Sequence, residues 1–445
     1  MMPEYGQLRG RVDWTLVIAV AGLVAIGTMG ILSAASPLPY YAQIVQRHFL
    51  AVGFGIALFM FGLGFNYQIF QDQAKTLYVL TLIMMTAVLF IGEVQRGTRG
   101  WVNLGLFSFQ PSELARLLTM LVLANYLDKQ ASRTGAVRYV FGAFAVAMPV
   151  LALILLEPDF SSTLPIFPMV LGMLFCAGAN IAPLLAMAAC GALTFTLPLI
   201  WAVLSVRMDL TSGSVILTAL MRLRSFDMPL VIAILGVCLL AFAAWRVTLA
   251  FRLPAPGLYF IAGTAIVVLG LCTAVVFDHQ LKGYQRDRFV SFLVPEADPK
   301  GASYNVRQAQ VAIGSGGLWG KGVFSGTQSR LGFLPERHTD FVYAVIGEEM
   351  GFLGALSVLA LYLLLLWRVV HTARLARDNY GYLVCCGVAV TYMFYLVVNV
   401  GMCLGVMPVA GIPLPLLSYG GSSLAVNLLA LGIVTNIYSR RYAFY

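Results

Sequence analysis

Long apolar runs alternate with short polar segments along almost the whole chain. The twelve runs cover residues 14–34, 48–66, 75–92, 112–127, 139–156, 163–179, 182–204, 229–245, 257–277, 341–367, 381–402 and 419–437. About 20 consecutive apolar residues suffice for a helix to cross the hydrocarbon core of a bilayer. The runs lack the strict alternation of apolar and polar residues that is typical of barrel strands. The pattern therefore predicts an all-α polytopic membrane protein with about twelve spans.

The composition agrees with a membrane protein. The chain has 445 residues, of which 60% are hydrophobic and 11% charged, whereas soluble domains carry about 25% charged residues. The seven cysteines lie in or beside apolar runs, and none has a histidine at metal-ligand spacing. We interpret them as core residues without disulfides, and we expect no metal site among them. The first apolar run is too long for the core of a cleavable signal peptide.

The basic residues indicate how the spans are oriented. Arg and Lys gather at the N-terminus, in 128–138, 246–252 and 368–377, and in the C-terminal tail. Twelve spans place these five segments on one side, which the positive-inside rule makes cytoplasmic. Both termini are then cytoplasmic, and the polar segment 278–340 is extracytoplasmic. This bias explains much of the net charge of +9; an anionic lipid or diphosphate substrate is the alternative explanation.

One outward segment, 205–228, departs from this rule because it carries three arginines. Its apolar stretch SVILTALM predicts a short helix that lies in the membrane interface. The span count between 180 and 256 depends on this segment.

The polar segment 278–340 is the most unusual part of the chain. Loops this long are usually functional or disordered, and the aromatic and apolar residues here favour order. Asp298 precedes Pro299, which biases its backbone to an extended conformation. Cationic candidates in the same loop are Arg286, Arg307 and Lys321. An acid among cations suits a general base beside an anionic leaving group, and the alternative is a set of solvated loop charges.

The motif QPSELARL begins a second candidate site. Pro111 suits the first turn of a helix, with Gln110 or Ser112 as its cap. Glu113 and Arg116 are three residues apart and so share one helix face, where they can pair. Ionisable residues inside membrane spans often mark functional sites, although a structural ion pair explains them equally well.

Two further segments carry polar residues at predicted membrane boundaries. In LLEPDFSSTL, Glu157 and Asp159 flank Pro158 and either bind a cation or cap the next helix. In 407–426, three prolines prevent a regular helix, so this segment is expected to line a polar cavity, with Ser418 as a substrate contact. The alternative is a proline-rich surface loop. We predict no resident cofactor and leave a divalent cation (Mg²⁺ or Mn²⁺) open.

With these motifs in place, the chain resembles the SEDS family (shape, elongation, division and sporulation). The matching motifs are RGTRGWVNLG with QPSELARL, EPDFSST, the stretch from ADPKG to GEEMG, and GIPLPLLSYGGSS. The sequences AIGSGG, GTQS, PERHTDF and GIPLP are more similar to the elongation branch, RodA, than to the division branch, FtsW. The resemblance covers the chain from the first span to the tail and is weakest in 180–256.

The resemblance implies a function and a place for it. The family polymerises the lipid-linked precursor lipid II into peptidoglycan glycan strands and releases undecaprenyl diphosphate. It implies that Asp298 is the general base and that Glu113, Arg116 and Asp159 contact substrate, with Lys321, Arg286, Arg307 and Ser418 as further candidates. It also implies a class B penicillin-binding protein as partner, no nucleic acid, and an extracytoplasmic active site on a bacterial plasma membrane.

Three features depart from the family pattern. Arg116 stands where lysine is usual, and Ser161 replaces a glycine. Family members usually have ten spans, so residues 182–245 are interpreted as an inserted pair of spans within one integral membrane domain, 1–445.

Other functions fit the same pattern less well. A lipid II flippase would also be a polytopic bundle with a central cavity, and a scaffold would need only partner-binding helices. A flippase has no need for an extracytoplasmic base among cations, so the long loop favours a transferase. A division-type polymerase is the nearest alternative.

Overall fold

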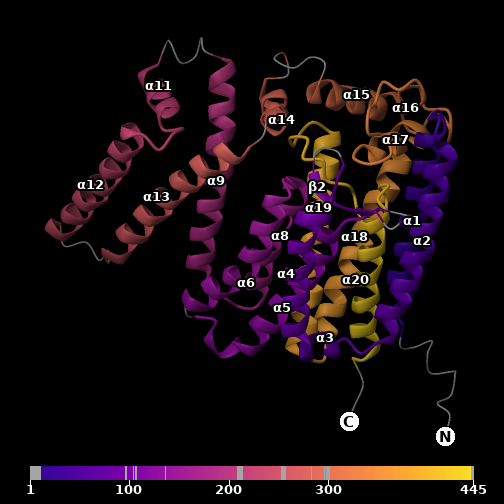
Figure 1. Cartoon of the computed structure of the whole chain (residues 1–445), viewed down its shortest axis with the longest axis horizontal. Helices are drawn as coiled ribbons and strands as arrows, with labels where there is room; N and C mark the ends of the chain where they lie inside the picture. Colours follow the sequence, from indigo (N-terminus) through magenta and orange to yellow (C-terminus); the bar gives the residue numbers. More distant parts are fainter. Residues whose placement is uncertain are drawn as a thin grey trace, which may run out of the picture. The chain divides into compact units, whose positions relative to one another are not determined.

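Nearly all of the chain folds into helices in the computed structural model (Figure 1). The structure describes residues 12–95, 98–103, 105, 108–135, 137–207, 214–251, 257–281, 283–294, 296 and 301–441. The chain forms two compact units. Unit 1 comprises Met1–Ala179 and Asn305–Tyr445, and unit 2 comprises Asn180–Tyr304.

Unit 1 combines elements from both ends of the sequence. Its N-terminal part contains α1 (Trp14–Ala35), α2 (Tyr41–Gly64), α3 (Gln68–Asp72), α4 (Ala74–Ile91), β1 (Glu93–Gln95), β2 (Thr98–Asn103), β3 (Ser108–Phe109), α5 (Pro111–Lys129), the 3₁₀ turn η2 (Ala131–Arg133), α6 (Val137–Leu156), α7 (Phe160–Thr163) and α8 (Ile166–Cys176). Its C-terminal part contains α15 (Ala302–Ser315, in this unit from Asn305), α16 (Thr327–Arg330), α17 (Val342–Glu349), α18 (Gly351–Leu375), α19 (Asn379–Cys403) and α20 (Gly421–Ser439).

Helices α2 and α20 approach closely because glycines line their contact. A Cβ on Gly62 would lie 2.9 Å from the Leu429 carbonyl oxygen, and a Cβ on Gly432 would lie 2.4 Å from that of Phe59. Both distances are too short for a real side chain. Small residues let helix backbones approach in membranes, where van der Waals packing replaces the hydrophobic effect. The second and the last helix of the chain thereby pack against each other in one unit.

A small antiparallel sheet, β1–β2–β3, precedes α5 and was not expected from the sequence. Val102 faces Phe109, and Asn103 faces Ser108. The Ser422 hydroxyl at the start of α20 donates to the Ser108 carbonyl at 3.0 Å. The sheet therefore leads the chain into α5 at a position held by α20.

Unit 2 contains α9 (Ile181–Val206), α11 (Val215–Arg222), α12 (Met228–Ala250), α13 (Gly257–Gln280) and α14 (Gly283–Leu293). Its core cluster consists of Leu197, Trp201, Leu230, Leu271, Ala274 and Val275. The Trp201 indole donates to the Leu220 carbonyl at 2.8 Å and so ties α11 to α9. The predicted short helix within 205–228 is thus present as α11.

Among the described residues, ten helices are long and apolar enough to cross a membrane. These are α1, α2, α4, α6, α9, α12, α13, α18, α19 and α20. The other two predicted spans, 112–127 and 163–179, correspond to α5, which carries four charged residues, and to the short helices α7 and α8. The chain is a nearly all-helical, multi-pass membrane protein.

The predicted span 341–367 has the wrong boundary. Its first part forms a separate helix, α17, and the membrane-length helix α18 starts at Gly351, whose φ is +67°. A positive φ suits glycine and breaks the helix at this point. The run is apolar enough to suggest one span, but the break follows from backbone geometry that hydropathy does not register.

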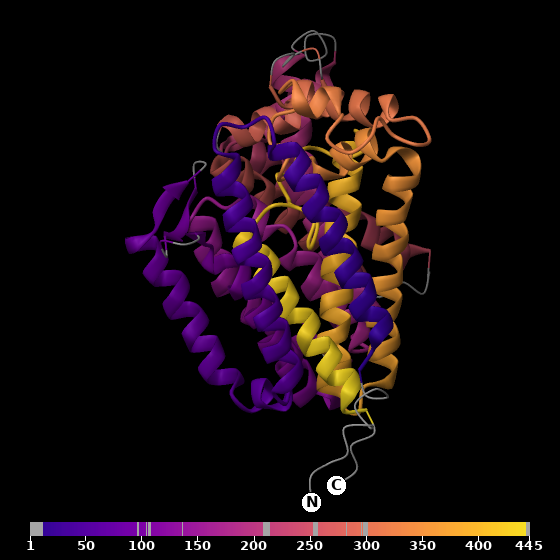
Figure 2. The same cartoon turned by 90° about the vertical axis from the view of Figure 1, so that its right-hand side faces the viewer.

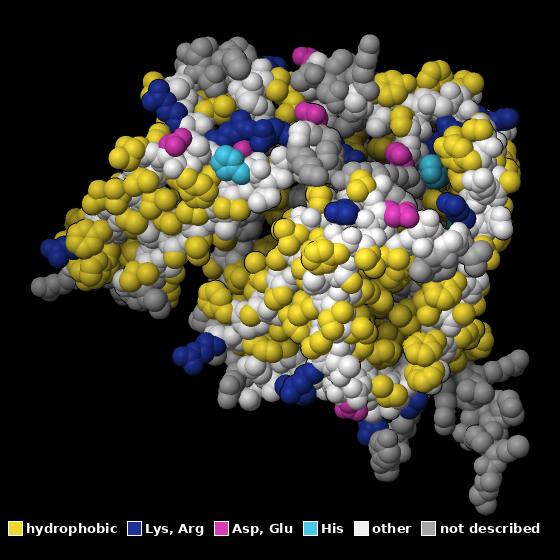
Figure 3. All heavy atoms as spheres, in the orientation of Figure 1, with side chains coloured by type: hydrophobic (Ala, Val, Ile, Leu, Met, Phe, Trp, Pro, Cys, Tyr) yellow, Lys and Arg dark blue, Asp and Glu magenta, His cyan; other side chains and the backbone are white. Residues whose placement is uncertain are grey.

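The ends of unit 1 are distinct. The start of α1 and the end of α20 lie at one end, and the helices between α15 and α18 lie at the other (Figures 1 and 2). On the face shown in Figure 3, hydrophobic side chains cover the middle of unit 1, and charged side chains lie mainly toward its two ends. This distribution is typical of a protein embedded in a bilayer.

Candidate functional site

The Glu113–Arg116 pair lies in the first turns of α5. An Arg116 guanidinium nitrogen lies 2.6 Å from the Glu113 carboxylate, and both side chains are buried. The other terminal nitrogen of Arg116 donates to the Tyr395 hydroxyl of α19, and the guanidinium carbon lies 5.0 Å from that ring's centroid. The predicted pairing is confirmed. The aromatic partner on α19 was not predicted.

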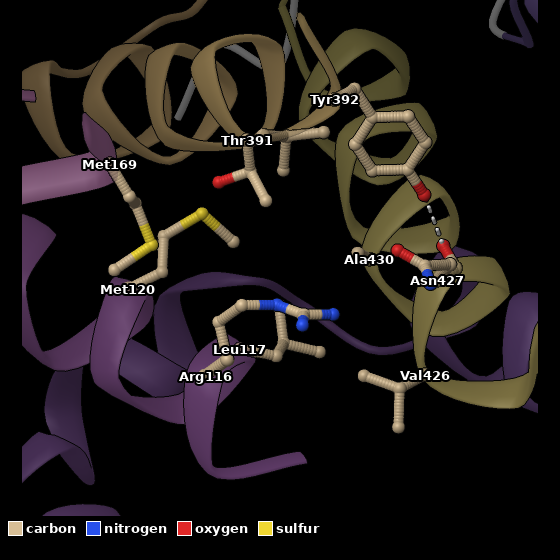
Figure 4. A pocket seen from close by; sticks show the side chains of 10 residues that line it. Arg116, Leu117, Met120, Met169, Thr391, Tyr392, Val426, Asn427 and Ala430 are labelled. Atoms are coloured by element: carbon tan, nitrogen blue, oxygen red, sulfur yellow. Dashed lines mark hydrogen bonds between the residues drawn. The ribbon is translucent and has the colours of Figure 1, made fainter. Parts of the chain in front are cut away.

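A small cavity of about 20 Å³ adjoins Arg116 (Figure 4). Its other lining residues include Met120, Met169, Thr391, Tyr392 and Asn427. A cavity of this size holds about one water molecule. The pair therefore belongs to the protein interior, where it joins α5 to α19, rather than to an open surface wide enough for a sugar.

Asp159 is the centre of a polar cluster where α5 and α7 begin. It accepts from the Gln110 side-chain amide at 2.6 Å, the Ser112 hydroxyl at 3.3 Å and the Ser161 hydroxyl at 2.9 Å. It also accepts from the backbone amide and the hydroxyl of Ser162, at 3.1 and 2.6 Å. Gln110 occupies the N-cap position of α5, as one of the two predicted alternatives, but its side chain binds Asp159 and makes no capping hydrogen bond.

Ser161 contributes a hydroxyl where the family usually has glycine. That hydroxyl is one of the donors to Asp159. The departure from the family pattern therefore adds a hydrogen bond to the Asp159 carboxylate and removes none. Asp159 satisfies the capping alternative, since it accepts from Ser162 N–H of the next helix, and its donors hold the carboxylate in one orientation.

Glu157 differs sharply from its neighbour. It is fully buried, and neither carboxylate oxygen has a hydrogen-bond partner in the described part of the chain. A Cβ on Gly100 of β2 would lie 2.8 Å from one of these oxygens, so the hairpin packs directly on the acid. Burial and the nearby Asp159 raise the pKa of Glu157 to about 8. Glu157 is therefore mostly protonated at neutral pH.

Of the segment 407–426 that was predicted to be non-helical, residues 407–420 lie between α19 and α20 without a helix, whereas 421–426 form the start of α20. The Asn399 amide donates to the Ile412 carbonyl at 2.8 Å and to the Asp340 carbonyl at 3.0 Å. The Ser418 hydroxyl accepts from the Leu414 amide at 2.8 Å and is buried. Ser418 thus stabilises the turn of its own segment, and its predicted substrate contact stays a prediction.

Lys321 occupies a structural position beside the start of α18. Its ammonium donates to Ser315 and Thr327 at 2.7 Å each and to the fully buried Glu348 carboxylate at 3.0 Å. Glu348 also accepts from the backbone amides of Gln328 and Ser329. These hydrogen bonds lower the pKa of Glu348 despite its burial.

The adjacent acid, Glu349, holds the same region to α1. It accepts from the Ser33 hydroxyl and from the Phe324 amide at 3.3 Å. The sequence analysis did not identify Glu348 or Glu349, although two consecutive acids in the GEEMG motif were visible. They attach the segment 315–330 to α1 and α18.

The other two cations predicted in the long loop, Arg286 and Arg307, have different surroundings. In unit 2, Arg286 lies 3.2 Å from the buried Asp278 carboxylate, which also pairs with Arg224 at 2.7 Å. In unit 1, Arg307 is exposed on α15, and within the described residues it has no hydrogen-bond or ion-pair partner. The substrate contacts of Arg286, Arg307 and Lys321 stay predictions. Asp298 lies outside the described residues.

Within the described part of the chain, no group of three or more His, Cys, Asp or Glu side chains is placed to hold a metal ion. Among the described residues, the neighbouring acids Glu157 and Asp159 are surrounded by hydroxyls, an amide and backbone. The described site is therefore a set of buried polar clusters.

These motifs and this fold have relatives of known name. The profile of the cell cycle protein family FtsW/RodA/SpoVE matches residues 11–212 and 210–443. The chain belongs to this family.

Individual relatives align over almost the whole chain. The peptidoglycan glycosyltransferase RodA of Treponema pallidum is 31% identical over 96% of this chain and 98% of its own length. The peptidoglycan glycosyltransferase MrdB of Escherichia coli K12 is 28% identical over 97% of this chain and 94% of its own length. A probable peptidoglycan glycosyltransferase FtsW of Thiomicrospira cyclica is 31% identical over 97% of this chain and 92% of its own length.

Solved structures agree with the sequence relatives. A chain from a study of how a peptidoglycan synthase complex coordinates polymerization and crosslinking has a TM-score of 0.63 at 30% identity, and the match covers 97% of this chain and 98% of that one. The rod shape determining protein RodA of Thermus thermophilus has a TM-score of 0.59 at 26% identity, and the match covers 97% of this chain and 98% of that one. The fold predicted from the resemblance is confirmed.

Proposed function

We propose that this protein is a peptidoglycan glycosyltransferase that polymerises lipid II into glycan strands during cell elongation. The observation that carries the proposal is the alignment of nearly the entire chain with relatives named peptidoglycan glycosyltransferase, two of them RodA or MrdB. The supporting structural observation is that the family's polar motifs converge in unit 1, around the start of α5.

The proposed chemistry places Asp298 as the general base. It removes the proton from the acceptor sugar hydroxyl as that oxygen attacks the anomeric carbon of the lipid-linked donor, and undecaprenyl diphosphate leaves. A positioned base typically contributes about 10²–10⁴-fold to rate. Arg307, exposed and free of protein partners among the described residues, is the proposed contact for the diphosphate.

The buried clusters have a positioning role in this proposal. Asp159 orients Gln110 at the start of α5, and Glu113–Arg116 joins α5 to α19. The active site is assigned to the extracytoplasmic side, with both termini cytoplasmic. This assignment is supported by the position of α15–α17 at the end of unit 1 opposite the start of α1 (Figure 2).

The test is polymerisation of labelled lipid II by the purified protein, alone and with a class B penicillin-binding protein, read as glycan polymer on a gel. Asp298→Asn should abolish polymer while leaving expression and thermal stability unchanged. Asp287→Asn is the matched control, since it removes an exposed carboxylate from the same loop and should retain activity. Near-normal polymerisation by Asp298→Asn would contradict the assignment.

The same preparation separates the transferase from a flippase. In sealed vesicles, a flippase would move labelled lipid II between leaflets without forming polymer. Polymer formation from lipid II supplied on the outer face supports the transferase. The elongation assignment is tested separately, by whether depletion of the protein rounds cells or blocks their division.

A further inference from the structure

An apolar surface projects from the outward end of unit 1 near α16. We call it the apolar knob. It consists of Leu318, Trp319, Val323, Phe324, Leu331 and Phe333, all between 41% and 79% exposed. Trp319 is the most exposed of them, at 79%. Hydrophobic side chains gather over this end of unit 1 in Figure 3. Contiguous exposed apolar surface marks an interaction site or a membrane contact.

The knob is held rigidly at the level where a membrane span begins. The Phe352 amide in the first turn of α18 donates to the Gly317 carbonyl at 2.8 Å, and the Leu353 amide donates to that of Leu318 at 3.3 Å. Lys321 and Gly322 donate their backbone amides to the carbonyls of Glu348 and Glu349. The knob therefore cannot shift far along the axis of α18.

Phe324 carries an aromatic side chain on a strained backbone. Its φ is +62°, in the left-handed region that favours glycine. The Glu349 carboxylate accepts from its amide, and Arg330 donates to its carbonyl at 3.1 Å, so the surroundings impose this conformation. Glycine would relieve the strain, yet an aromatic ring stands here, 44% exposed.

The knob continues a lipid-facing stripe on α18. Phe352, Leu356, Leu363, Trp367 and Val370 are exposed along one side of this helix, at helical spacing. From Phe352 to Val370 the stripe is about 27 Å long, slightly less than the roughly 30 Å hydrocarbon core. The knob extends the apolar surface at the outer end of the stripe, and Trp367 lies near its inner end.

The charges around the knob fit a membrane surface. Residues 316–333 contain no acid and two cations, of which Lys321 is paired with Glu348 within the protein and Arg330 is exposed. Tryptophan beside a cation is typical of the bilayer interface, where the indole sits at headgroup level and the cation meets lipid phosphates. At the other end of α18, Arg368 lies 5.4 Å from the Trp367 ring and also pairs with Asp13 at 2.8 Å.

We propose that the apolar knob is an interfacial anchor that inserts into the outer leaflet beside α18. The anchor holds the outward segment 316–333 on the bilayer surface, the region in which the headgroup of any lipid-linked substrate lies. The occupant is the acyl–headgroup boundary of the membrane. A transmembrane or juxtamembrane segment of a partner protein is the competing occupant.

The test measures where Trp319 lies, using the full chain in nanodiscs of phosphatidylglycerol and phosphatidylethanolamine. The tryptophan emission of wild type minus that of Trp319→Phe isolates this residue and keeps an aromatic ring in the knob. The signal of Trp367 is obtained in the same way from Trp367→Phe. Brominated acyl chains should quench the Trp319 signal as strongly as the Trp367 signal, and aqueous iodide should quench neither. Trp201, fully buried in unit 2, is the control that neither quencher reaches.

Two results would overturn the anchor. A Trp319 signal quenched by iodide and not by brominated lipid would place the knob in water. Loss of iodide quenching only after a class B penicillin-binding protein is added would show that the knob docks a protein. Equal thermal unfolding of wild type and Trp319→Phe confirms that the difference spectrum reports one residue. None of these readouts depends on glycosyltransferase activity.

Discussion

Glu113 and Arg116 show why a charged pair can be kept inside a helical membrane protein. Each side chain neutralises the other at 2.6 Å, and Tyr395 contributes both a hydroxyl and a ring face to the guanidinium. Removing one member leaves the other charge buried and unpaired, which costs about 3–5 kcal/mol. Arginine here makes two directed contacts that a lysine could not make with the same geometry.

Reversing either charge alone should therefore lower expression or activity strongly. The double reversal, Glu113→Arg with Arg116→Glu, should recover part of the loss, because the pair is restored although Tyr395 keeps its old position. The measurement is polymer yield and thermal stability for the four members of the double-mutant cycle. Strictly additive losses would argue against direct coupling.

Glu157 predicts a pH dependence. Its folded-state pKa of about 8 lies above the ordinary value of 4.5, so the folded state binds the proton more tightly than the unfolded state. The contribution of this proton to stability is fully present below about pH 4.5 and is lost as pH rises through about 8. Over that interval the free energy of unfolding falls by at most about 1.4 kcal/mol per pH unit. Burial is the first cause of the raised pKa, and the charge of Asp159 is the second.

Glu157→Gln keeps the shape of the protonated acid and removes its titration. The thermal unfolding temperature, measured between about pH 5 and pH 9, should fall less steeply with pH in this variant than in wild type. Glu93→Gln, which changes an exposed carboxylate in the same hairpin, should follow the wild-type slope. Identical slopes for wild type and Glu157→Gln would contradict the assignment.

At the scale of elements, buried acids hold the segment between α15 and α18 in place. Lys321 and two backbone amides satisfy Glu348, and Ser33 of α1 donates to Glu349. The largely exposed segment is thereby attached to the core of unit 1. The loop that the sequence marks as functional is, in this part, firmly attached to the membrane helices.

Lys321→Ala should therefore destabilise the protein, by about 1–3 kcal/mol, because a buried carboxylate loses its cation. Limited proteolysis should cut within 316–330 faster than in wild type. Arg307→Ala is the matched control, since this cation is exposed without protein partners among the described residues. It should leave stability unchanged and lower only polymerisation. Equal stability of the two variants would show that Lys321 has no structural role.

At the scale of the whole molecule, the number of spans decides on which side the proposed catalytic loop, 278–340, lies. We propose that 182–245 is an inserted pair of spans, α9 and α12, which returns the chain to its original side. Unit 2 starts at Asn180, close to the start of this proposed insertion. An error of one span here would move segment 278–340 to the cytoplasm and contradict the proposed function.

Cysteine accessibility tests the span count. In a cysteine-free background, Phe226→Cys and Phe251→Cys replace exposed residues that flank α12, 59% and 75% exposed. A membrane-impermeant maleimide added outside intact cells should label the first and not the second. Labelling of position 251 from outside would show that the topology, and with it the site assignment, is wrong.

The sequence by itself determined the class of the protein, most of its helices and the Glu113–Arg116 pair. These follow from local rules, the length of apolar runs and the 3.6-residue helical period, that operate within one segment. Only the tertiary structure decided which residues from distant segments meet. Tyr395 binds Arg116 across 279 positions, and Glu349 meets Ser33 across 316. Hydropathy averaged over the run also did not place the backbone break at Gly351, although Glu348 and Glu349 directly precede it in the sequence.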